Sequence, residues 1–436
     1  MTLLELTPRV PTTDRLTALP VAIVGAGPVG LAAAANLAER GIDFVILEAG
    51  SSVGSSIRLW GHVPMFSPWR YLVDPASRRL LEASGWRIPA EDRAPTGGEL
   101  VTQYLEPLAA LDEIGPRIRF GTRVVAVARE GMDRTRTAGR DRTPFVLRVV
   151  EDGVVSELSA RAVIDASGTY LSPNPLGSTG LDPIGWEQAS DAVTHALPDV
   201  TGGDRERFAG RRVTVVGAGH SAANTLIRLA ELAESTPTRV AWLIRNRSAV
   251  RVSSDPGDEL PDRARLGSRL DRLVAEGAIE LIDSFEIGAV EPLADGGVRL
   301  VGTRRGEHAS HETDVVVNAT GFRPDLAMLR EVRLDLDDIV EAPRLLAPLI
   351  DPNVHSCGTV EPHGFRELTQ PERGFFLVGM KSYGRAPTFL LATGYEQVRS
   401  VTAWIAGDMS AASAVALTLP ATGVCSTDQA GGGCCS

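Results

Sequence analysis

The chain has 436 residues, 43% of them hydrophobic and 23% charged, which suits a globular protein of two or three domains. Its net charge of −11 argues against a nucleic-acid surface or a polybasic membrane anchor. No run is long and apolar enough to span a membrane, and no segment has the pattern of a secretory signal, so we expect a cytoplasmic protein.

The first strong pattern is a strand, a turn, a helix and a second strand within residues 21–48. The turn is Gly25-x-Gly27-x-x-Gly30, called the first fingerprint below. These glycines permit a tight turn, a close approach of the backbone to a pyrophosphate and close packing of the helix on the strand. Glu48 ends the second strand, where an acid accepts hydrogen bonds from ribose hydroxyls. The unit therefore predicts a dinucleotide site.

Cap and turn signals outline the segment that follows. Thr96 and Glu99 form a capping-box pattern at the start of a helix that extends to residue 108. Asp152-Gly153 is a strong hairpin signal. We also expect a strand at 119–127, hairpin strands at 145–150 and 154–158, and a strand at 162–165 that enters Ala166-Ser167-Gly168.

A second unit of the same kind begins at residue 212. Its turn, the second fingerprint, is Gly217-x-Gly219-x-x-Ala222, and its second strand leads into Arg245-Asn246-Arg247. No carboxylate stands where Glu48 stands in the first unit, and an arginine there accommodates a 2′-phosphate. We therefore predict a site that prefers NADPH, with Arg245 as the main candidate and Arg247 as the second. Solvated arginines without cofactor preference are the alternative.

Two such units about 190 residues apart predict an α/β fold of two Rossmann-like dinucleotide-binding domains. The second domain is inserted into the first. We place a first part of the FAD-binding domain at 18–190, an NAD(P)H-binding domain at 191–312, a second FAD-binding part at 313–415 and a flexible cysteine-containing tail at 416–436.

The chain resembles the class B flavin monooxygenases, within a wider superfamily of two-dinucleotide-fold flavoproteins that includes thioredoxin-reductase-like enzymes. The resemblance rests on the first fingerprint with Glu48 and Gly54, on residues 208–222, on Asn318-Ala319-Thr320-Gly321 and its sequel, and on residues 374–379. Asp165-Ala166-Ser167-Gly168 looks like the first-domain counterpart of the motif at 318–321.

The resemblance implies FAD and NADPH as cofactors. The expected cofactor-binding residues are Gly25, Gly27, Gly30, Glu48, Gly54, Val125, Ala166, Gly168, Gly217, Gly219, Ser221, Arg245, Thr320, Gly321 and Gly379.

The chain also departs from the family pattern. The signature FxGxxxHxxx(W/Y) survives only as Thr194-His195, where His195 lies either at the hinge between domains or on the surface. The family's Gly-Gly-x-Trp is replaced by Gly54-Ser55-Ser56-Ile57, with Trp60 a few residues further on.

Catalytic candidates flank the two FAD motifs. By position, residues 58–70 should border the flavin ring, so Trp60, His62 and Phe66 are candidates, and plain loop packing is the alternative. Lys381, the only lysine in the chain, and Arg385 follow the closing FAD motif. Either residue would place a positive charge near reduced flavin and favour its anionic form.

The cysteines decide between reaction classes. A disulfide reductase needs a Cys-x-x-Cys beside the flavin, and this sequence has none. The leading hypothesis is therefore an FAD-dependent, NADPH-consuming monooxygenase that uses flavin hydroperoxide chemistry, with oxygen and a small substrate as partners. The alternatives are an NADPH-dependent flavoprotein reductase that works through tail cysteines, and a non-catalytic redox or metalloid sensor. A homodimer is left open.

The chain ends in a cysteine-rich tail. Cys425, Cys434 and Cys435 lie in the last 12 residues, next to a glycine run. Soft thiolates bind thiophilic ions, mercuric reductase uses a comparable C-terminal pair, and the chain looks similar to flavin monooxygenases of arsenic-resistance operons. These three cysteines are thus candidate metal ligands and an arsenic compound is a candidate substrate. An incidental tail is the alternative.

Overall fold

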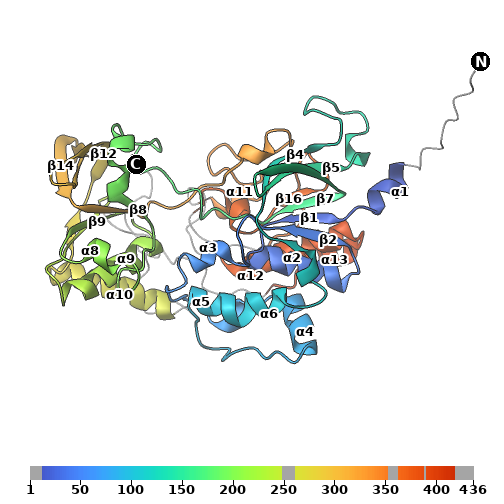
Figure 1. Ribbon diagram of the computed structural model, residues 1–436, viewed down its shortest axis with the longest axis horizontal. Helices are drawn as coiled ribbons and strands as arrows, with labels where there is room; N and C mark the ends of the chain where they lie inside the picture. The colour runs from blue at the N-terminus through green and yellow to red at the C-terminus, as the bar shows by residue number, and fades with distance from the viewer. Residues whose placement is uncertain (1–11, 248–260, 352–361, 387–388, 418–436) are drawn as a thin grey trace, which may run out of the picture.

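The chain folds around two five-stranded parallel sheets, which form the cores of the two lobes seen in Figure 1. The computed structural model describes residues 12–247, 261–351, 362–386 and 389–417. Every neighbouring pair of strands in the two sheets is parallel. The predicted α/β fold with two Rossmann-like domains is confirmed.

The first sheet has the strand order β16-β7-β1-β2-β3. Its strands are β1 (Val21–Val24), β2 (Phe44–Leu47), β3 (Ile118–Arg119), β7 (Ala162–Asp165) and β16 (Phe375–Leu377). Helices α2 (Pro28–Glu39) and α12 (Leu391–Ile405) cover one face, and an antiparallel sheet of β4 (Thr122–Arg129), β5 (Phe145–Glu151) and β6 (Val154–Ala160) lies on the other side. Strand β16 returns from the C-terminal part of the chain, so this domain is discontinuous in sequence.

The second sheet has the order β11-β10-β9-β15-β8 and the same three layers. Its strands are β8 (Val193–His195), β9 (Arg212–Val216), β10 (Arg239–Leu243), β11 (Glu280–Ile282) and β15 (Val315–Asn318). Helices α9 (His220–Ala233) and α10 (Pro261–Ala275) lie on one side, and β12 (Phe285–Pro292), β13 (Val298–Arg304) and β14 (Glu307–Thr313) on the other.

Shorter helices complete the lobes. They are α1 (Thr12–Thr17), α3 (Ser55–Arg58), α4 (Pro75–Ala83), α5 (Gly97–Leu100), α6 (Glu106–Ala109), α7 (Trp186–Ala189), α8 (Arg205–Phe208), α11 (Ala347–Ile350) and α13 (Met409–Ser413). Within the described residues, no helix is long and apolar enough to cross a membrane.

Local signals predicted several elements correctly. The capping box is present, because Thr96 Oγ1 accepts from the Glu99 N–H and Glu99 Oε2 accepts from the Thr96 N–H. The hairpin turns at Asp152-Gly153, where both residues have positive φ. The strand expected at 119–127 is wrong in its extent. Gly121, with φ of +64°, breaks it into β3 and β4, which belong to different sheets.

The second domain extends further at both ends than the boundaries placed at 190 and 313. Strand β15 pairs with β9 and β8, because its apolar residues complete the second sheet. Leu176 and Ala189 pack into the core beneath β12 and β13, which adds the preceding segment to the same domain. The strand periodicity was visible in the sequence, but the sheet that each strand joins is decided by pairing.

Two connecting segments run between the domains and pair with each other. The Asn174 N–H donates to the Gly321 carbonyl at 2.9 Å, and the Arg323 N–H donates to the Ser172 carbonyl at 3.0 Å. The Tyr170 and Phe322 rings pack against each other in a tilted arrangement, with their centroids 5.1 Å apart. The two crossings therefore form one short antiparallel connection.

Candidate active site

The first fingerprint forms an open cradle at the N-terminus of α2. Gly25 has a φ of +100°, and a Cβ at Gly30 would lie 2.0 Å from the Gly25 carbonyl oxygen, so both positions require glycine. A Cβ at Gly27 would meet no protein atom within 4 Å. Gly27 caps α2 without a side-chain hydrogen bond, and the first turn carries no acid. These open amides suit an anionic pyrophosphate, so the cradle fits the dinucleotide that the sequence predicts.

Glu48 is tied to this cradle. Its Oε2 accepts from the Ala26 N–H at 2.7 Å and its Oε1 accepts from the Gly50 N–H at 2.8 Å. A carboxylate has about four acceptor positions, so two remain for ribose hydroxyls. The side chain is 9% exposed, which places it at the edge of the cradle.

The second fingerprint repeats this geometry on the second sheet. Gly217 has a φ of +130°, and a Cβ there would lie 2.1 Å from the Ala319 carbonyl oxygen. A Cβ at Gly219 would meet nothing within 4 Å, and Gly219 caps α9 without a side-chain hydrogen bond. Ala222 is fully buried at the position of the third glycine. Ser221 lies in the first turn of α9. This second cradle also fits a pyrophosphate.

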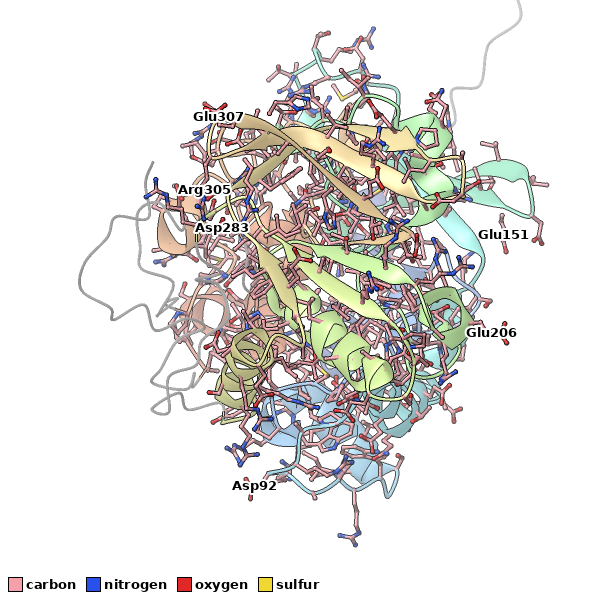
Figure 2. All side chains as sticks on the ribbon, turned by 90° about the vertical axis from the view of Figure 1, so that its left-hand side faces the viewer. Asp92, Glu151, Glu206, Asp283, Arg305 and Glu307 are labelled. Carbon is pink, nitrogen blue, oxygen red and sulfur yellow. The ribbon has the colours of Figure 1, made fainter. Side chains whose placement is uncertain are left out.

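Arg245 follows β10 and is exposed. Its Nη1 donates to the Ser178 carbonyl at 3.2 Å, and within the described ranges it has no ion-pair partner. The neighbouring carboxylate of Asp283 is already bound by Arg305 at 2.9 Å, and these two residues are labelled in Figure 2. The hydrogen bond from Arg305 lowers the pKa of Asp283. The backbone N–H of Ser284 donates to the Asn246 carbonyl at 3.1 Å, so the segments that carry Asp283 and Arg245 are adjacent.

The motif at 318–321 connects the second sheet to the paired linkers. Asn318 Nδ2 donates to the Asn174 carbonyl at 2.9 Å, and Thr320 Oγ1 donates to Asn318 Oδ1 at 2.7 Å. Gly321 has a φ of +101°. The motif therefore fixes the turn where the chain leaves the second domain, directly beside Gly217.

Residues 58–70 belong to the first domain, and one of them, Phe66, contacts the second domain. The ring of Trp60 covers Gly97, where a Cβ would lie 2.8 Å from the ring, and His62 is half-buried. Phe66 reaches the second domain, since its ring centroid is 5.3 Å from that of His220, the first residue of α9. The sequence placed these aromatics near a flavin by position, and the contact with the second fingerprint was not visible in it.

Lys381 lies in a 3₁₀ turn at Gly379–Tyr383, directly after β16. The side chain is 2% exposed, and its ammonium donates to Asp165 Oδ2 at 2.8 Å and to Ser167 Oγ at 3.0 Å. Asp165 is fully buried. The pair joins the turn after β16 to the turn after β7, the two parts of the discontinuous domain. The sequence pointed to Lys381 but not to its partner Asp165.

Arg385, the other cation expected beside the flavin, has a different environment. It is exposed, and its Nε donates to Glu341 Oε2 at 2.5 Å. Its distance along the chain from Lys381 is short, but Gly384, with a φ of +57°, turns the chain between them. A surface ion pair therefore replaces the free charge that the sequence suggested.

A buried polar network behind this turn was missed by sequence reasoning. Gln397 Oε1 accepts from the Gly379 N–H at 2.7 Å, and Gln397 Nε2 lies 2.9 Å from Ser382 Oγ and 3.0 Å from His363 Nε2. The network fixes the turn against α12. A glutamine in a long helix gives no local signal that it will be fully buried.

The structure places the remaining expected residues as follows. Gly54 has a φ of +63° and donates its N–H to the Ala26 carbonyl at 3.0 Å, beside the first cradle. Val125 lies at a bulge of β4 and has no ladder partner there in β5. Gly168 and Gly379 have positive φ and follow β7 and β16, and the Ala166 carbonyl oxygen lies 2.9 Å from a Cβ built on Gly25.

Two predictions fall elsewhere. His195 ends β8 and is exposed, in register with Asn318. Cys425, Cys434 and Cys435 lie outside the described residues, as does Cys357. Among the residues that the structure describes, no group of three His, Cys, Asp or Glu side chains is arranged to hold a metal ion.

Two dinucleotide cradles on two parallel sheets, joined by paired linkers, define a flavoprotein oxidoreductase of the two-dinucleotide-fold class. Residues 22–348 match the family described as pyridine nucleotide-disulphide oxidoreductase. This is more than half of the chain, so the chain belongs to that family.

Curated relatives include both oxygen-using and electron-transferring enzymes. Flavin-containing monooxygenase FMO GS-OX-like 2 of Arabidopsis thaliana is 29% identical over 249 residues, which cover 51% of this chain and 49% of the relative. The match thus spans about half the length of that monooxygenase. A ferredoxin--NADP reductase of Granulibacter bethesdensis is 27% identical, with 77% of this chain and 80% of the relative covered.

Among solved structures, bacillithiol disulfide reductase of Bacillus cereus superposes with a TM-score of 0.65 at 20% identity, covering 89% of this chain and 99% of that chain. This likeness shows the fold. Together with the family, the relatives establish a flavin-dependent oxidoreductase with FAD and NADPH as cofactors.

Proposed function

We propose that this chain is an NADPH-consuming monooxygenase that inserts oxygen into a small substrate. The observation that carries the proposal is the absence of any Cys-x-x-Cys from the full sequence, although both dinucleotide cradles are complete. A thioredoxin-reductase-like enzyme passes electrons from flavin to a disulfide through a Cys-x-x-Cys, so its absence weighs against that chemistry and leaves only the tail cysteines for a reductase. The flavin-containing monooxygenase relative supports the oxygen-using alternative.

The proposed division of labour follows the two cradles. The amides at the start of α2 hold the pyrophosphate of FAD, with Glu48 on its ribose, and those at the start of α9 hold the pyrophosphate of NADPH. When bound, FAD supplies the chemistry of accepting a hydride and activating oxygen. Phe66 contacts His220 at the start of α9, where it would help to exclude water from the reacting centre, and Trp60 packs against Gly97 of the first domain.

NADPH preference is assigned to Arg245. The guanidinium is exposed, and the carboxylate of Asp283 on the adjacent segment is neutralised by Arg305. Loss of a hydrogen bond to a charged group weakens binding by about 10- to 100-fold. We expect Arg245→Ala to raise KM for NADPH by about that factor and to leave KM for NADH nearly unchanged. A parallel rise for both cofactors would contradict this role, and Arg247→Ala provides the matched comparison.

The reaction of the NADPH-reduced protein with oxygen tests the monooxygenase proposal. We expect the NADPH-reduced protein, mixed rapidly with oxygen, to pass through a long-lived absorbing species that differs from both reduced and oxidised flavin. Addition of the correct substrate should shorten its lifetime and lower the hydrogen peroxide released per NADPH. Direct return to oxidised flavin, with peroxide release that no tested small substrate lowers, would count against oxygen insertion.

A second candidate is supported by the coverage of the ferredoxin--NADP reductase match, which extends over 80% of that relative. Such an enzyme passes single electrons to a protein acceptor. The same preparation should then reduce a ferredoxin or an artificial one-electron acceptor at a rate that exceeds its reaction with oxygen. Turnover with these acceptors slower than with oxygen favours the monooxygenase.

The finer proposal names an arsenic compound as substrate. Its support is the set of three thiols in the last 12 residues, because soft thiolates bind trivalent arsenic. We expect Cys434→Ser with Cys435→Ser to abolish arsenite binding and to leave NADPH-driven flavin reduction unchanged. Arsenite binding and arsenite-dependent turnover equal to those of the wild type would exclude a role for the tail.

A further inference from the structure

The choice of lysine at position 381 is unusual for this chain. One of the 44 Lys and Arg residues is lysine, and all the others are arginine. The chain uses arginine even where it buries a cation, since Arg129 and Arg140 are 3% and 4% exposed and bind Glu372. The site of Lys381 therefore needs an ammonium group, whereas the other buried cationic sites of the chain are filled by guanidinium groups.

The ammonium of Lys381 is held by two acceptors from one turn. Asp165 Oδ2 lies at 2.8 Å and Ser167 Oγ at 3.0 Å. Asp165 Oδ1 accepts in turn from Ser167 Oγ at 2.6 Å and from the Ser167 N–H at 3.1 Å. Carboxylate, hydroxyl and ammonium thus form one closed group of three side chains, called the Lys381 cluster below.

The Lys381 cluster lies level with the first fingerprint. Asp165 ends β7 in register with Val24, the residue that precedes Gly25, and with Leu377 at the end of β16. Ligands of parallel α/β sheets bind at the carboxyl ends of the strands, where these three strands end together. The cluster therefore stands at the edge of the sheet that holds FAD.

The cluster has an open side and an unused donor. Asp165 and Lys381 are buried, but Ser167 is exposed, and a Cβ on Gly168 would meet no atom within 4 Å. An ammonium has three N–H groups, and within the part of the chain that the structure describes two protein acceptors are in reach of Lys381. One N–H is left for an acceptor that is not protein.

We propose that Lys381 is a cofactor-binding residue, whose third N–H donates to an oxygen of bound FAD while Asp165 and Ser167 hold the ammonium in place. The compact ammonium offers three donors from one atom, whereas a guanidinium spreads its donors over a plane and needs more room. Through this contact FAD itself connects the two separate parts of its domain, one after β7 and the other after β16.

The test measures the dissociation constant of FAD by titrating it into FAD-depleted full-length protein. Removal of a charge-assisted hydrogen bond predicts about 10- to 100-fold weaker FAD binding in Lys381→Met. That variant also leaves Asp165 as an unpaired buried charge, so it alone does not separate a structural role from a ligand contact.

The double variant Lys381→Met with Asp165→Asn separates the two roles, because no unpaired buried charge remains. If Lys381 binds FAD, the double variant keeps the 10- to 100-fold weaker binding while its melting temperature without FAD returns towards that of the wild type. If the double variant binds FAD as tightly as the wild type, the proposal is wrong and the ion pair is only structural. Arg148→Met, which removes an exposed cation paired with Glu157, is the control and should leave FAD binding unchanged.

A second measurement needs no variant. Because the chain has a single lysine, protein grown with ¹⁵N-labelled lysine side chains gives one ammonium resonance. Addition of FAD should shift this resonance and slow the exchange of its protons with water, whereas NADPH alone should not. A resonance that FAD leaves unchanged would overturn the proposal, even if the variants failed to fold.

Discussion

At the scale of single residues, one buried charge cluster links distant parts of the first domain. Glu372 accepts from Arg129 Nε at 2.8 Å and from Arg140 Nη2 at 2.7 Å, and all three side chains are almost fully buried. Burial opposes ionisation, but the hydrogen bonds from Arg140 and Arg129 outweigh it and lower the pKa of Glu372. The group ties the start of β16 to the antiparallel sheet above the first sheet.

Glu372→Gln should therefore destabilise the protein strongly. The substitution leaves two buried guanidinium groups without a counter-charge, which costs about 3–5 kcal/mol in comparable cases. Urea unfolding of the full chain measures the change. Glu157→Gln breaks an exposed pair with Arg148 and should change stability by less than about 1 kcal/mol. Equal losses in the two variants would contradict the role of Glu372.

The pKa of Asp74 is shifted in the opposite direction to that of Glu372. Burial raises the pKa of this helix-capping carboxyl to about 6, against hydrogen bonds from Ser77 and Asn36 that lower it. Since the folded pKa exceeds the ordinary value of 3.8, the stability from this group is full below about pH 4 and is lost as pH rises through about 6. The loss is on the order of 3 kcal/mol.

Asp74→Asn removes this pH dependence and keeps an oxygen to cap α4 through the Ser77 N–H. We expect the variant to melt above the wild type at pH 7.5, and the difference to shrink or reverse at pH 4.5. Melting curves at the two pH values measure this. A difference that is independent of pH would show that Asp74 is ionised throughout the range.

At the scale of elements, each fingerprint combines two kinds of glycine. Gly25, Gly30 and Gly217 are demanded by the protein itself, through positive φ or a Cβ clash with backbone oxygen. Gly27 and Gly219 have ordinary backbone angles and open space beside them, so only a bound ligand requires them.

This difference predicts separable effects. Gly30→Ala should prevent stable folding of the first domain, because its Cβ would lie 2.0 Å from backbone oxygen. Gly27→Ala should keep the melting temperature of the FAD-depleted protein and weaken FAD binding, while Gly219→Ala should raise KM for NADPH and spare FAD. Calorimetry and FAD titration measure these effects. Normal FAD affinity in Gly27→Ala would show that the pyrophosphate does not approach this residue.

At the scale of the whole molecule, the Phe66–His220 pair is one described contact between the two lobes. The Phe66 ring lies 5.3 Å from that of His220, so a loop of the first domain covers the start of α9 in the second. This contact and the paired linkers both join the domain of the first fingerprint to that of the second. An aromatic pair of this kind contributes about 0.5–1.5 kcal/mol.

Phe66→Ala should loosen this closure. We expect FAD binding to stay unchanged and the share of NADPH electrons released as hydrogen peroxide to rise about two- to tenfold, because the reacting centre is less shielded. Peroxide release measured against NADPH consumption gives this share. Val154→Ala, an exposed apolar position on β6, should change neither quantity. Unchanged peroxide release in Phe66→Ala would show that the Phe66–His220 contact does not shield the reacting centre.

The sequence by itself determined the two strand–turn–helix units, their glycine spacing and the residues after each second strand. These features are local, since a positive φ, a missing Cβ and an open helix N-terminus are all set within a few residues. The same local logic predicted the capping box at Thr96 and the hairpin at Asp152-Gly153 correctly.

Only the tertiary structure decided which distant residues meet. The pairing of Lys381 with Asp165 spans 216 residues, that of Glu372 with Arg129 spans 243, and the Phe66–His220 contact joins two domains. The tertiary structure also distinguished Lys381 from Arg385, because Lys381 is buried and Arg385 is exposed. The sequence had suggested both residues as a positive charge beside the flavin. Side-chain burial and charge pairing depend on how strands assemble into sheets, and no local pattern carries that information.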